Sequence, residues 1–359
     1  MSYDQPNSHA KISFPGLDAL RGYAAIAVVL FHASPVVWPG RLMQSGYLAV
    51  DLFFVMSGFV VAHAYENKVY DIGAVAFIRL RVIRFAPLFL VGGLLGLIRP
   101  IFQILEGQDI TGIFFATISY LLFLPSPSTA LSDTLFAPLN PPAWSLMLEL
   151  YINIIWAFCL PYLSTKRLVA ITSLGAFGCL AVLVGGLSLS AGSHIQDFAV
   201  GVARILFSFP LGLLLYRFRH TIPAIYLPNF AIATFCLLVF ASPQFAALEM
   251  AFIFVISPLL VLSAARQTSH TMVSRYGAKS SYCIYMLHMP GTWVAYGVCS
   301  KLGASPVAGT IAWIIALLVF APYIDRWFDQ PARTLLMRKS LSFQQRKSDP
   351  QDTVLTIAQ

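Results

Sequence analysis

The chain has 359 residues, of which 58% are hydrophobic and 11% charged, and its mean hydropathy is +0.75. This composition excludes a soluble globular domain of ordinary make-up and indicates a polytopic membrane protein. The formal net charge of +8 would suit a nucleic-acid partner, but the placement of the basic residues along the chain has a simpler explanation in membrane topology. The five cysteines lie in apolar runs without Cys-x-x-Cys spacing, so the sequence predicts neither a metal site nor a disulfide framework.

Ten segments are long and apolar enough to cross a membrane as helices. They are residues 17–38, 47–66, 82–105, 143–162, 168–190, 199–216, 222–242, 248–264, 282–300 and 305–325. The stretch 110–125 is also apolar, but it is short and runs into a Pro/Ser-rich sequence. The sequence therefore predicts an all-α polytopic integral membrane protein with about ten transmembrane helices. Residues 110–125 are expected to form an additional re-entrant or interfacial segment.

The basic residues decide whether 110–125 crosses the membrane. If it does not cross, most of the 23 lysine and arginine residues fall on one side, which the positive-inside rule assigns to the cytoplasm; if it crosses, this bias largely disappears. Both termini are therefore expected to be cytoplasmic, and the loop 126–142 faces the other side. We expect a cytoplasmic N-terminal segment (1–13), a single membrane-embedded domain (14–339) and a polar, disordered cytoplasmic tail (340–359).

The first apolar segment contains ionisable residues, among them Asp18, Arg21 and His32. Such groups are costly inside a membrane and are functional candidates by default. Arg21 and His32 are about three helical turns apart, so they share one side of the helix, roughly 16 Å apart along its axis. This indicates a polar seam through the membrane. The alternatives are that Arg21 anchors the helix at the lipid headgroups and that His32 is a satisfied packing residue.

Asp51 opens the second apolar segment on the same non-cytoplasmic side at which the first segment ends near His32. A short hairpin could bring the two side chains together, and a carboxylate beside an imidazole fixes its tautomer and raises its basicity. Capping of the helix N-terminus by Asp51 is an equally supported alternative.

Arg81 and Arg84 lie one turn apart where the third segment begins, a geometry suited to phosphate oxygens. Most arginines at such positions only mark the cytoplasmic side. Further along, Glu149 belongs to a polar stripe and needs a partner, such as Arg204, or a water-filled cavity. His288 is a single polar residue in an apolar run, and a packing role is favoured for it.

Together these stretches resemble the membrane-bound acyltransferase family 3 of integral-membrane O-acyltransferases over about residues 14–330. The resemblance rests on five pieces of sequence in the same order: Leu17-Asp18-Ala-Leu-Arg21-Gly22 with His32, Val50-Asp51 leading to Ser57-Gly58, Arg81-x-x-Arg84, Trp144-Ser145-Leu with Glu149, and Ser281-Tyr282 with Tyr285 and His288.

The resemblance implies transfer of an acyl group, expected to be acetyl from acetyl-coenzyme A, to a hydroxyl of an exopolysaccharide, lipopolysaccharide or related glycan. It implies no permanently bound cofactor and a place in the bacterial inner membrane, with the lipid bilayer, acyl-CoA and the hydroxyl acceptor as partners. The candidate site residues fall into three groups. They are His32 as base with Asp51 as its orienter and Glu149 as a further catalytic candidate; Arg21, Arg81 and Arg84 at coenzyme A; and Trp144, Ser145, Arg204 and His288 at the substrate.

Two other functions compete with this one. Intramembrane acidic residues and histidines would also suit a proton-coupled transporter, although no half-sequence repeat is visible. An acyltransferase acting on a non-carbohydrate small-molecule hydroxyl is the second. The sequence fixes neither the acceptor nor the oligomeric state, and a homo-oligomer is compatible with it.

Overall fold

The structure is a computed structural model that describes residues 13–348 apart from 41, 106–110, 127–134 and 224–225. Helices form nearly all of its regular structure, and one isolated bridge joins Leu135 to His194. The α-helices in chain order are α1 Pro15–Val37, α2 Ala49–Tyr65, α3 Val69–Ile72, α4 Ala74–Gly96, α5 Ile98–Leu105, α6 Thr111–Leu121, α7 Ala143–Cys159, α8 Thr165–Val184, α9 Phe198–Phe218, α10 Asn229–Ala241, α11 Ala246–Ala251, α12 Ser257–Ala265, α13 Met272–Lys301, α14 Pro306–Ile324 and α15 Gln330–Ser348.

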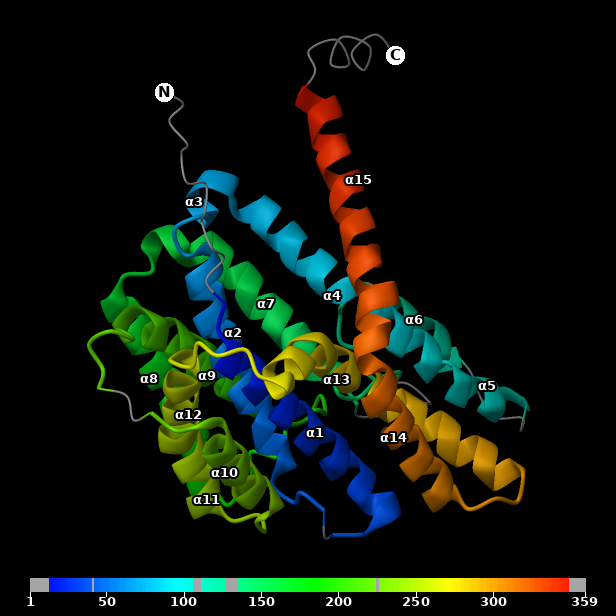
Figure 1. Ribbon diagram of the computed structural model, residues 1–359. Coiled ribbons are helices and arrows are strands. Elements are labelled where there is room, and N and C mark those ends of the chain that lie inside the picture. Colours follow the sequence, from blue (N-terminus) through cyan, green and yellow to red (C-terminus); the bar gives the residue numbers. More distant parts are fainter. Residues whose placement is uncertain (1–12, 41, 106–110, 127–134, 224–225, 349–359) are drawn as a thin grey trace, which may run out of the picture.

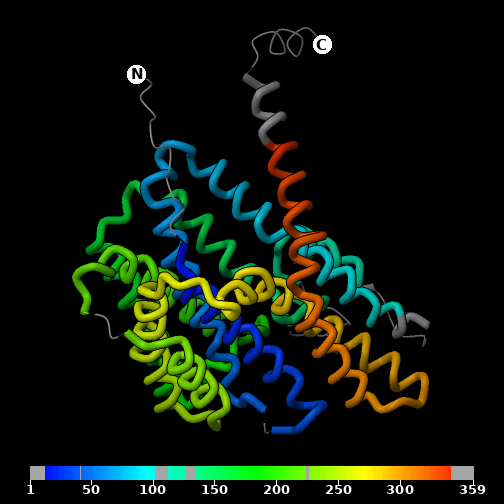
Figure 2. Tube along the Cα trace, in the orientation of Figure 1, coloured from blue at the N-terminus to red at the C-terminus, as the bar shows by residue number. Residues whose placement is uncertain are grey.

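All ten predicted spans coincide with helices, which confirms the fold class. Within the described residues, eight helical stretches are long and apolar enough to cross a membrane by length and composition. The other two predicted spans correspond to α10, which has only 13 residues, and α13, whose 30 residues include a polar first half. In Figures 1 and 2, α8 to α12 gather on one side of the bundle, and α5, α6 and α14 on the other.

The segment predicted to be re-entrant or interfacial forms α6, which has 11 residues. A helix of that length rises roughly 16 Å and cannot cross a hydrocarbon core of about 30 Å. The helix ends at Leu121, and the chain turns two residues later at Phe123, whose φ is 56°. Tyr120 fixes α6 on α4 by stacking on Phe89 at 4.2 Å and donating a hydrogen bond to the Phe89 carbonyl at 2.9 Å.

Glycines allow several helix pairs to approach closely, among them α2 with α9 and α1 with α13. On α2, a side chain at Gly58 would collide with the Phe209 carbonyl of α9, and one at Gly212 of α9 would collide with the Val55 carbonyl of α2. Gly22 of α1 lies against Gly277 of α13 in the same way. Small residues permit such contacts in membranes. They fix α2 against α9, which carry Asp51 and Arg204, and α1 against α13, which carry His32 and His288.

A proline inside a helix leaves a backbone carbonyl without an N–H partner, and at Pro290 and Pro322 a side chain supplies the missing donor. Pro290 frees the Met286 carbonyl, which accepts from Asn140 Nδ2 at 2.9 Å. Pro322 frees the Leu318 carbonyl, which accepts from the Tyr276 hydroxyl at 2.6 Å. These bonds tie α13 to the chain before α7 and to α14.

The expected disordered tail differs from the structure in its first part. A π-helical turn, Asp325–Asp329, connects α14 to α15, and α15 continues to Ser348. Arg79 on α4 donates to Ser340 at 3.0 Å, and this contact holds the helix where the polar composition indicated disorder. Residues 349–359 and 1–12 lie outside the described residues.

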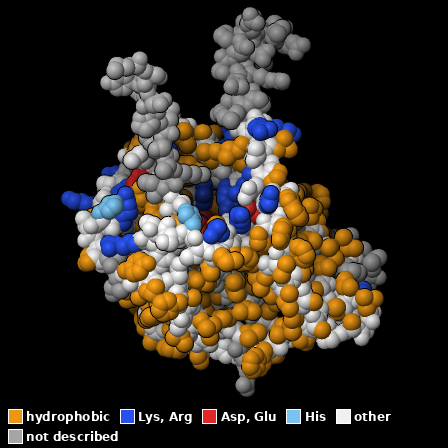
Figure 3. Space-filling view, viewed as in Figure 1, with side chains coloured by type: hydrophobic (Ala, Val, Ile, Leu, Met, Phe, Trp, Pro, Cys, Tyr) orange, Lys and Arg blue, Asp and Glu red, His pale blue; other side chains and the backbone are white. Residues whose placement is uncertain are grey.

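Apolar and basic side chains occupy different parts of the surface. On the face shown in Figure 3, apolar side chains cover most of the lower bundle, and lysines and arginines gather around a hollow near the end from which α15 projects. An apolar belt with a basic end is what an integral membrane protein presents to lipid and water.

Tyr276→Phe should lower the free energy of unfolding by about 1–3 kcal/mol, because it leaves the Leu318 carbonyl unbonded in an apolar setting. Thermal or denaturant unfolding of the detergent-purified protein measures this. Tyr323→Phe on α14 is the matched control, since that residue is 46% exposed. Equal stability of the two variants would contradict the role assigned to the Tyr276 hydroxyl.

Candidate active site

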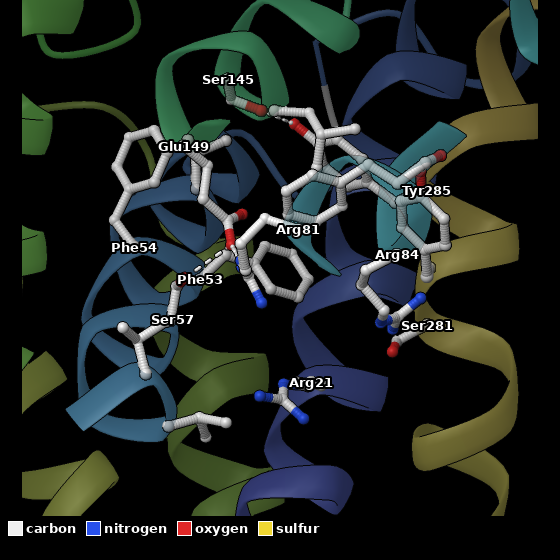
Figure 4. A pocket seen from close by; sticks show the side chains of 16 residues that line it. Arg21, Phe53, Phe54, Ser57, Arg81, Arg84, Ser145, Glu149, Ser281 and Tyr285 are labelled. Carbon is white, nitrogen blue, oxygen red and sulfur yellow. Dashed lines mark hydrogen bonds and ion pairs between the residues drawn. The ribbon is translucent and has the colours of Figure 1, made fainter. Parts of the chain in front are cut away.

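A cavity of about 210 Å³ lies between α1, α2, α4, α7 and α13. Its lining contains three arginines, Arg21, Arg81 and Arg84, and one carboxylate, Glu149. Figure 4 shows the three arginines, from α1 and α4, facing one space. The sequence predicted that these arginines act together, and the structure brings them together with a net positive charge.

Glu149 finds its partner within this cavity. Its Oε1 accepts from Arg81 Nη2 at 2.9 Å and from Ser57 Oγ at 2.5 Å. The predicted partner, Arg204, is bound elsewhere, so that part of the expectation was wrong. The sequence could not distinguish the two arginines, because both occur in apolar segments and only the helix packing selects between them.

The other two arginines remain accessible to a ligand. Arg21 pairs with Asp18 at 3.1 Å on its own helix. Arg84 lies over the Tyr282 ring at 4.9 Å, 3.9 Å from the Asp329 carboxylate, and its side chain is 40% exposed.

Two guanidinium nitrogens of the cavity, Arg81 Nε and Arg84 Nη1, have no hydrogen-bond partner within the described part of the chain. Buried donors without acceptors suit an incoming anion such as a phosphate.

Two hydroxyl groups lie close together in the wall of the cavity. Ser145 Oγ and Tyr285 Oη are 2.6 Å apart, and both lie near the Pro142 carbonyl, at 3.1 and 3.2 Å. Phe53 packs edge-on against the Tyr285 ring at 5.6 Å. Tyr285 was a sequence motif residue without an assigned role, and the structure places its hydroxyl in the cavity wall.

A pair of histidines lies directly behind Tyr285. The ring of His288, one turn further along α13, is 5.9 Å from the Tyr285 ring, and its Nε2 is 3.1 Å from His32 Nδ1. His288 is only 1% exposed. The sequence favoured a packing role for His288; the structure instead places it in contact with the predicted base. The Tyr-x-x-His spacing in the sequence indicated that His288 shares a helix face with Tyr285. The contact with His32 could not be predicted, because it depends on how α1 packs against α13.

Asp51 pairs with Arg204 rather than with His32, so its predicted contact with the base was wrong. Arg204 on α9 donates to both Asp51 oxygens, at 2.7 Å from Nη2 and 3.1 Å from Nε, and both side chains are 1% exposed. Asp51 does not cap α2 either; it sits inside the first turn and its side chain makes no cap bond. The glycine contact between α2 and α9 turns the carboxylate towards α9.

Arg204 also secures the loop that precedes α9. It donates to the Ala191 carbonyl at 3.0 Å and the Tyr47 carbonyl at 3.1 Å, and lies over the Trp144 ring at 5.5 Å. These contacts give Arg204 and Trp144, both predicted to bind substrate, a structural role.

Glu249, which the sequence analysis did not single out, holds the same loop. This buried carboxylate accepts from the Ser188 hydroxyl at 2.7 Å, the Leu189 N–H at 2.9 Å and the Tyr47 hydroxyl. The loop lines a second cavity together with the ends of α8 and α9, and its polar contributors include Ser190, His194 and Asp197. A single glutamate in an apolar stretch was the available signal.

A helical membrane bundle with an arginine-lined cavity beside a histidine pair fits the class of integral-membrane acyltransferases. The match of the chain to the family model described as an acyltransferase domain, over residues 14–324, makes the family definite. The chain belongs to acyltransferase family 3, as its motifs indicated. The transporter alternative gains no support from this match.

Named relatives extend the comparison. A Rhizobium radiobacter protein named protein 2 in picA locus is 41% identical over 39% of this chain and 79% of its own length. The putative peptidoglycan O-acetyltransferase YrhL of Bacillus subtilis is 25% identical over 92% of this chain and 56% of its own. The O-acetyltransferase OatA of Staphylococcus aureus is 33% identical over 21% of this chain and 13% of its own. The chain thus spans about half the length of the Bacillus relative. No solved structure matches the chain.

Asp51→Asn should cost about 3–5 kcal/mol of stability, because it leaves the Arg204 charge buried without its counter-ion. Combining Asp51→Leu with Arg204→Met should restore much of the loss, since an apolar pair has no charge to desolvate. Thermal unfolding in detergent measures both, with the exposed Asp71→Asn as control. An Asp51→Asn variant with normal stability but reduced turnover would contradict the structural role and indicate a catalytic role for Asp51.

Proposed function

We propose that this protein transfers an acetyl group from acetyl-coenzyme A to a hydroxyl of a bacterial cell-surface glycan, of which peptidoglycan is the leading candidate. The observation that carries the proposal is the cavity that begins at three arginines and ends at Tyr285, next to the histidine pair. The names of the Bacillus and Staphylococcus relatives support acetyl as the group, and the name of the Bacillus relative supports peptidoglycan as the acceptor.

The donor phosphates fit the arginine end of the cavity. Guanidinium groups bind phosphate oxygens through charge-assisted, often bidentate hydrogen bonds. Arg84 and Arg21 offer their charge at the mouth, and Arg81 retains an unpaired Nε beside its bond to Glu149. The remaining wall is largely apolar, with Phe53, Phe54 and neighbouring valines, which suits a thin pantetheine chain. The thioester would then lie near Tyr285.

His32 acts as the general base in this proposal. It takes the proton of the acceptor hydroxyl as the oxygen attacks the thioester carbonyl carbon. The carbonyl oxygen becomes an oxyanion, and the hydroxyls of Tyr285 and Ser145 in the cavity wall are the donors that we assign to it. Collapse of the tetrahedral intermediate breaks the carbon–sulfur bond, and the proton held by His32 goes to the departing thiolate. The products are the acetyl ester and free coenzyme A.

The acceptor approaches from the end of the bundle opposite the arginines. The loop between α8 and α9 adjoins the start of α2, whereas the arginines lie near the start of α4. Its second cavity offers hydroxyl, imidazole and carboxylate groups, which suit the hydroxyls of a sugar. With the basic end cytoplasmic, this arrangement accepts acetyl-CoA from the cytoplasm of a bacterial inner membrane and modifies a glycan outside it.

His32→Ala should reduce transfer by roughly 10²–10⁴-fold, since the acceptor hydroxyl loses its base. Coenzyme A binding should persist, because the arginines that contact the phosphates are unchanged. Single-turnover acetyl transfer and coenzyme A binding on detergent-purified variants measure the two effects. His220→Gln, an exposed histidine, is the control. Near-normal transfer by the His32 variant would remove that residue from the mechanism.

Arg84→Gln should raise the KM for acetyl-CoA roughly tenfold or more, because a charge-assisted phosphate contact is lost. The KM for the acceptor should stay unchanged. Arg79→Gln is the matched control on the same helix, since Arg79 faces Ser340 and does not line the cavity. Equal donor KM values for the two variants would show that the arginines of α4 serve topology alone.

A further inference from the structure

The contacts of His288 determine which of its ring nitrogens carries hydrogen. Its Nδ1 faces two backbone carbonyls of its own helix, that of Tyr285 at 2.7 Å and that of Ile284 at 3.1 Å. Carbonyl oxygens only accept hydrogen bonds, so Nδ1 must be the donor. In a neutral imidazole the lone pair then lies on Nε2, the atom that points at His32.

The same reasoning determines the state of His32. Its Nδ1 lies between two acceptors, His288 Nε2 at 3.1 Å and the Val28 carbonyl at 3.0 Å. Nδ1 must therefore carry the hydrogen and share it between them. The opposite arrangement needs a doubly protonated His288, a positive charge on a side chain that is 1% exposed within the membrane domain, which is costly.

We propose that His288 is a positioning residue that fixes His32 in the tautomer with hydrogen on Nδ1, leaving His32 Nε2 as the basic nitrogen. This inference rests on the proposed function of His32 as base. When Nε2 takes the acceptor proton, Nδ1 continues to donate to His288, so the hydrogen bond persists through the proton transfer. His288 occupies the place that a carboxylate holds in a serine–histidine–aspartate triad.

Two features support this assignment. The carboxylate that sequence reasoning placed here, Asp51, is fully engaged with Arg204. His288 itself is held in place on α13, since its carbonyl accepts from Trp313 Nε1 at 3.2 Å and Asn140 bonds the Met286 carbonyl half a turn earlier. The backbone that carries the His288 ring is therefore held by contacts from α14 and from the chain before α7.

The wild-type test is ¹⁵N NMR of the histidine rings in the full-length protein, with His32 assigned from the spectrum of His32→Ala. The proposal predicts a protonated Nδ1 and an unprotonated Nε2 for His32. A His32 ring with hydrogen on Nε2 would overturn it, and this measurement needs no variant of His288 to fold.

Two variants of His288 separate positioning from packing. His288→Gln supplies an acceptor oxygen, whereas His288→Leu fills the apolar space without one. Positioning predicts that the leucine variant loses roughly tenfold or more in kcat with donor KM within about twofold, and that glutamine recovers much of the loss. If His288 serves packing alone, the leucine variant should retain a higher kcat than the glutamine variant. Full transfer by His288→Leu, with His32→Ala inactive, would overturn the positioning role alone, whereas full transfer by His32→Ala would overturn the proposed function.

Discussion

Inside a membrane no water is available to satisfy a polar group, so each buried charge and freed carbonyl needs a partner from the protein. Asp51 with Arg204 shows this requirement most clearly, because the pair joins α2 to α9 and extends to the Ala191 and Tyr47 carbonyls. The same requirement places Asn140 against the carbonyl freed by Pro290. Polar groups therefore determine how the helices are joined, while glycines determine how closely they approach.

Pairing is incomplete at several buried polar atoms of the described residues, and two of these atoms belong to the candidate site. Arg81 Nε and Arg84 Nη1 lack hydrogen bonds among the described residues, and both belong to arginines that line the cavity. Such groups are costly unless a ligand completes them, which favours a binding function over a structural one. The histidine pair lies at the other end, where two hydroxyls separate it from the cavity.

Much of the fold was predictable from sequence because hydropathy reports directly on membrane crossing. The predicted segments all proved helical, and the short stretch 110–125 contains α6, whose eleven residues are too few to cross a bilayer. The site was predictable as a set of residues but not as a set of contacts. Arg21, Arg81 and Arg84 were grouped correctly, yet Asp51 and Glu149 were given the wrong partners, since pairing depends on the rotation of each helix against its neighbours. His288 was underestimated for the same reason.

Three arginines line the cavity, and the histidine pair lies behind Tyr285 in its wall. The central claim is that bound coenzyme A runs from the arginines towards Tyr285. A cryo-electron microscopy structure with bound coenzyme A tests the claim most directly. We expect the phosphates to contact Arg21, Arg81 and Arg84, and the thiol to lie beside Tyr285 on the side of His32. Phosphates bound away from these arginines, or a thiol directed away from the histidine pair, would contradict the account.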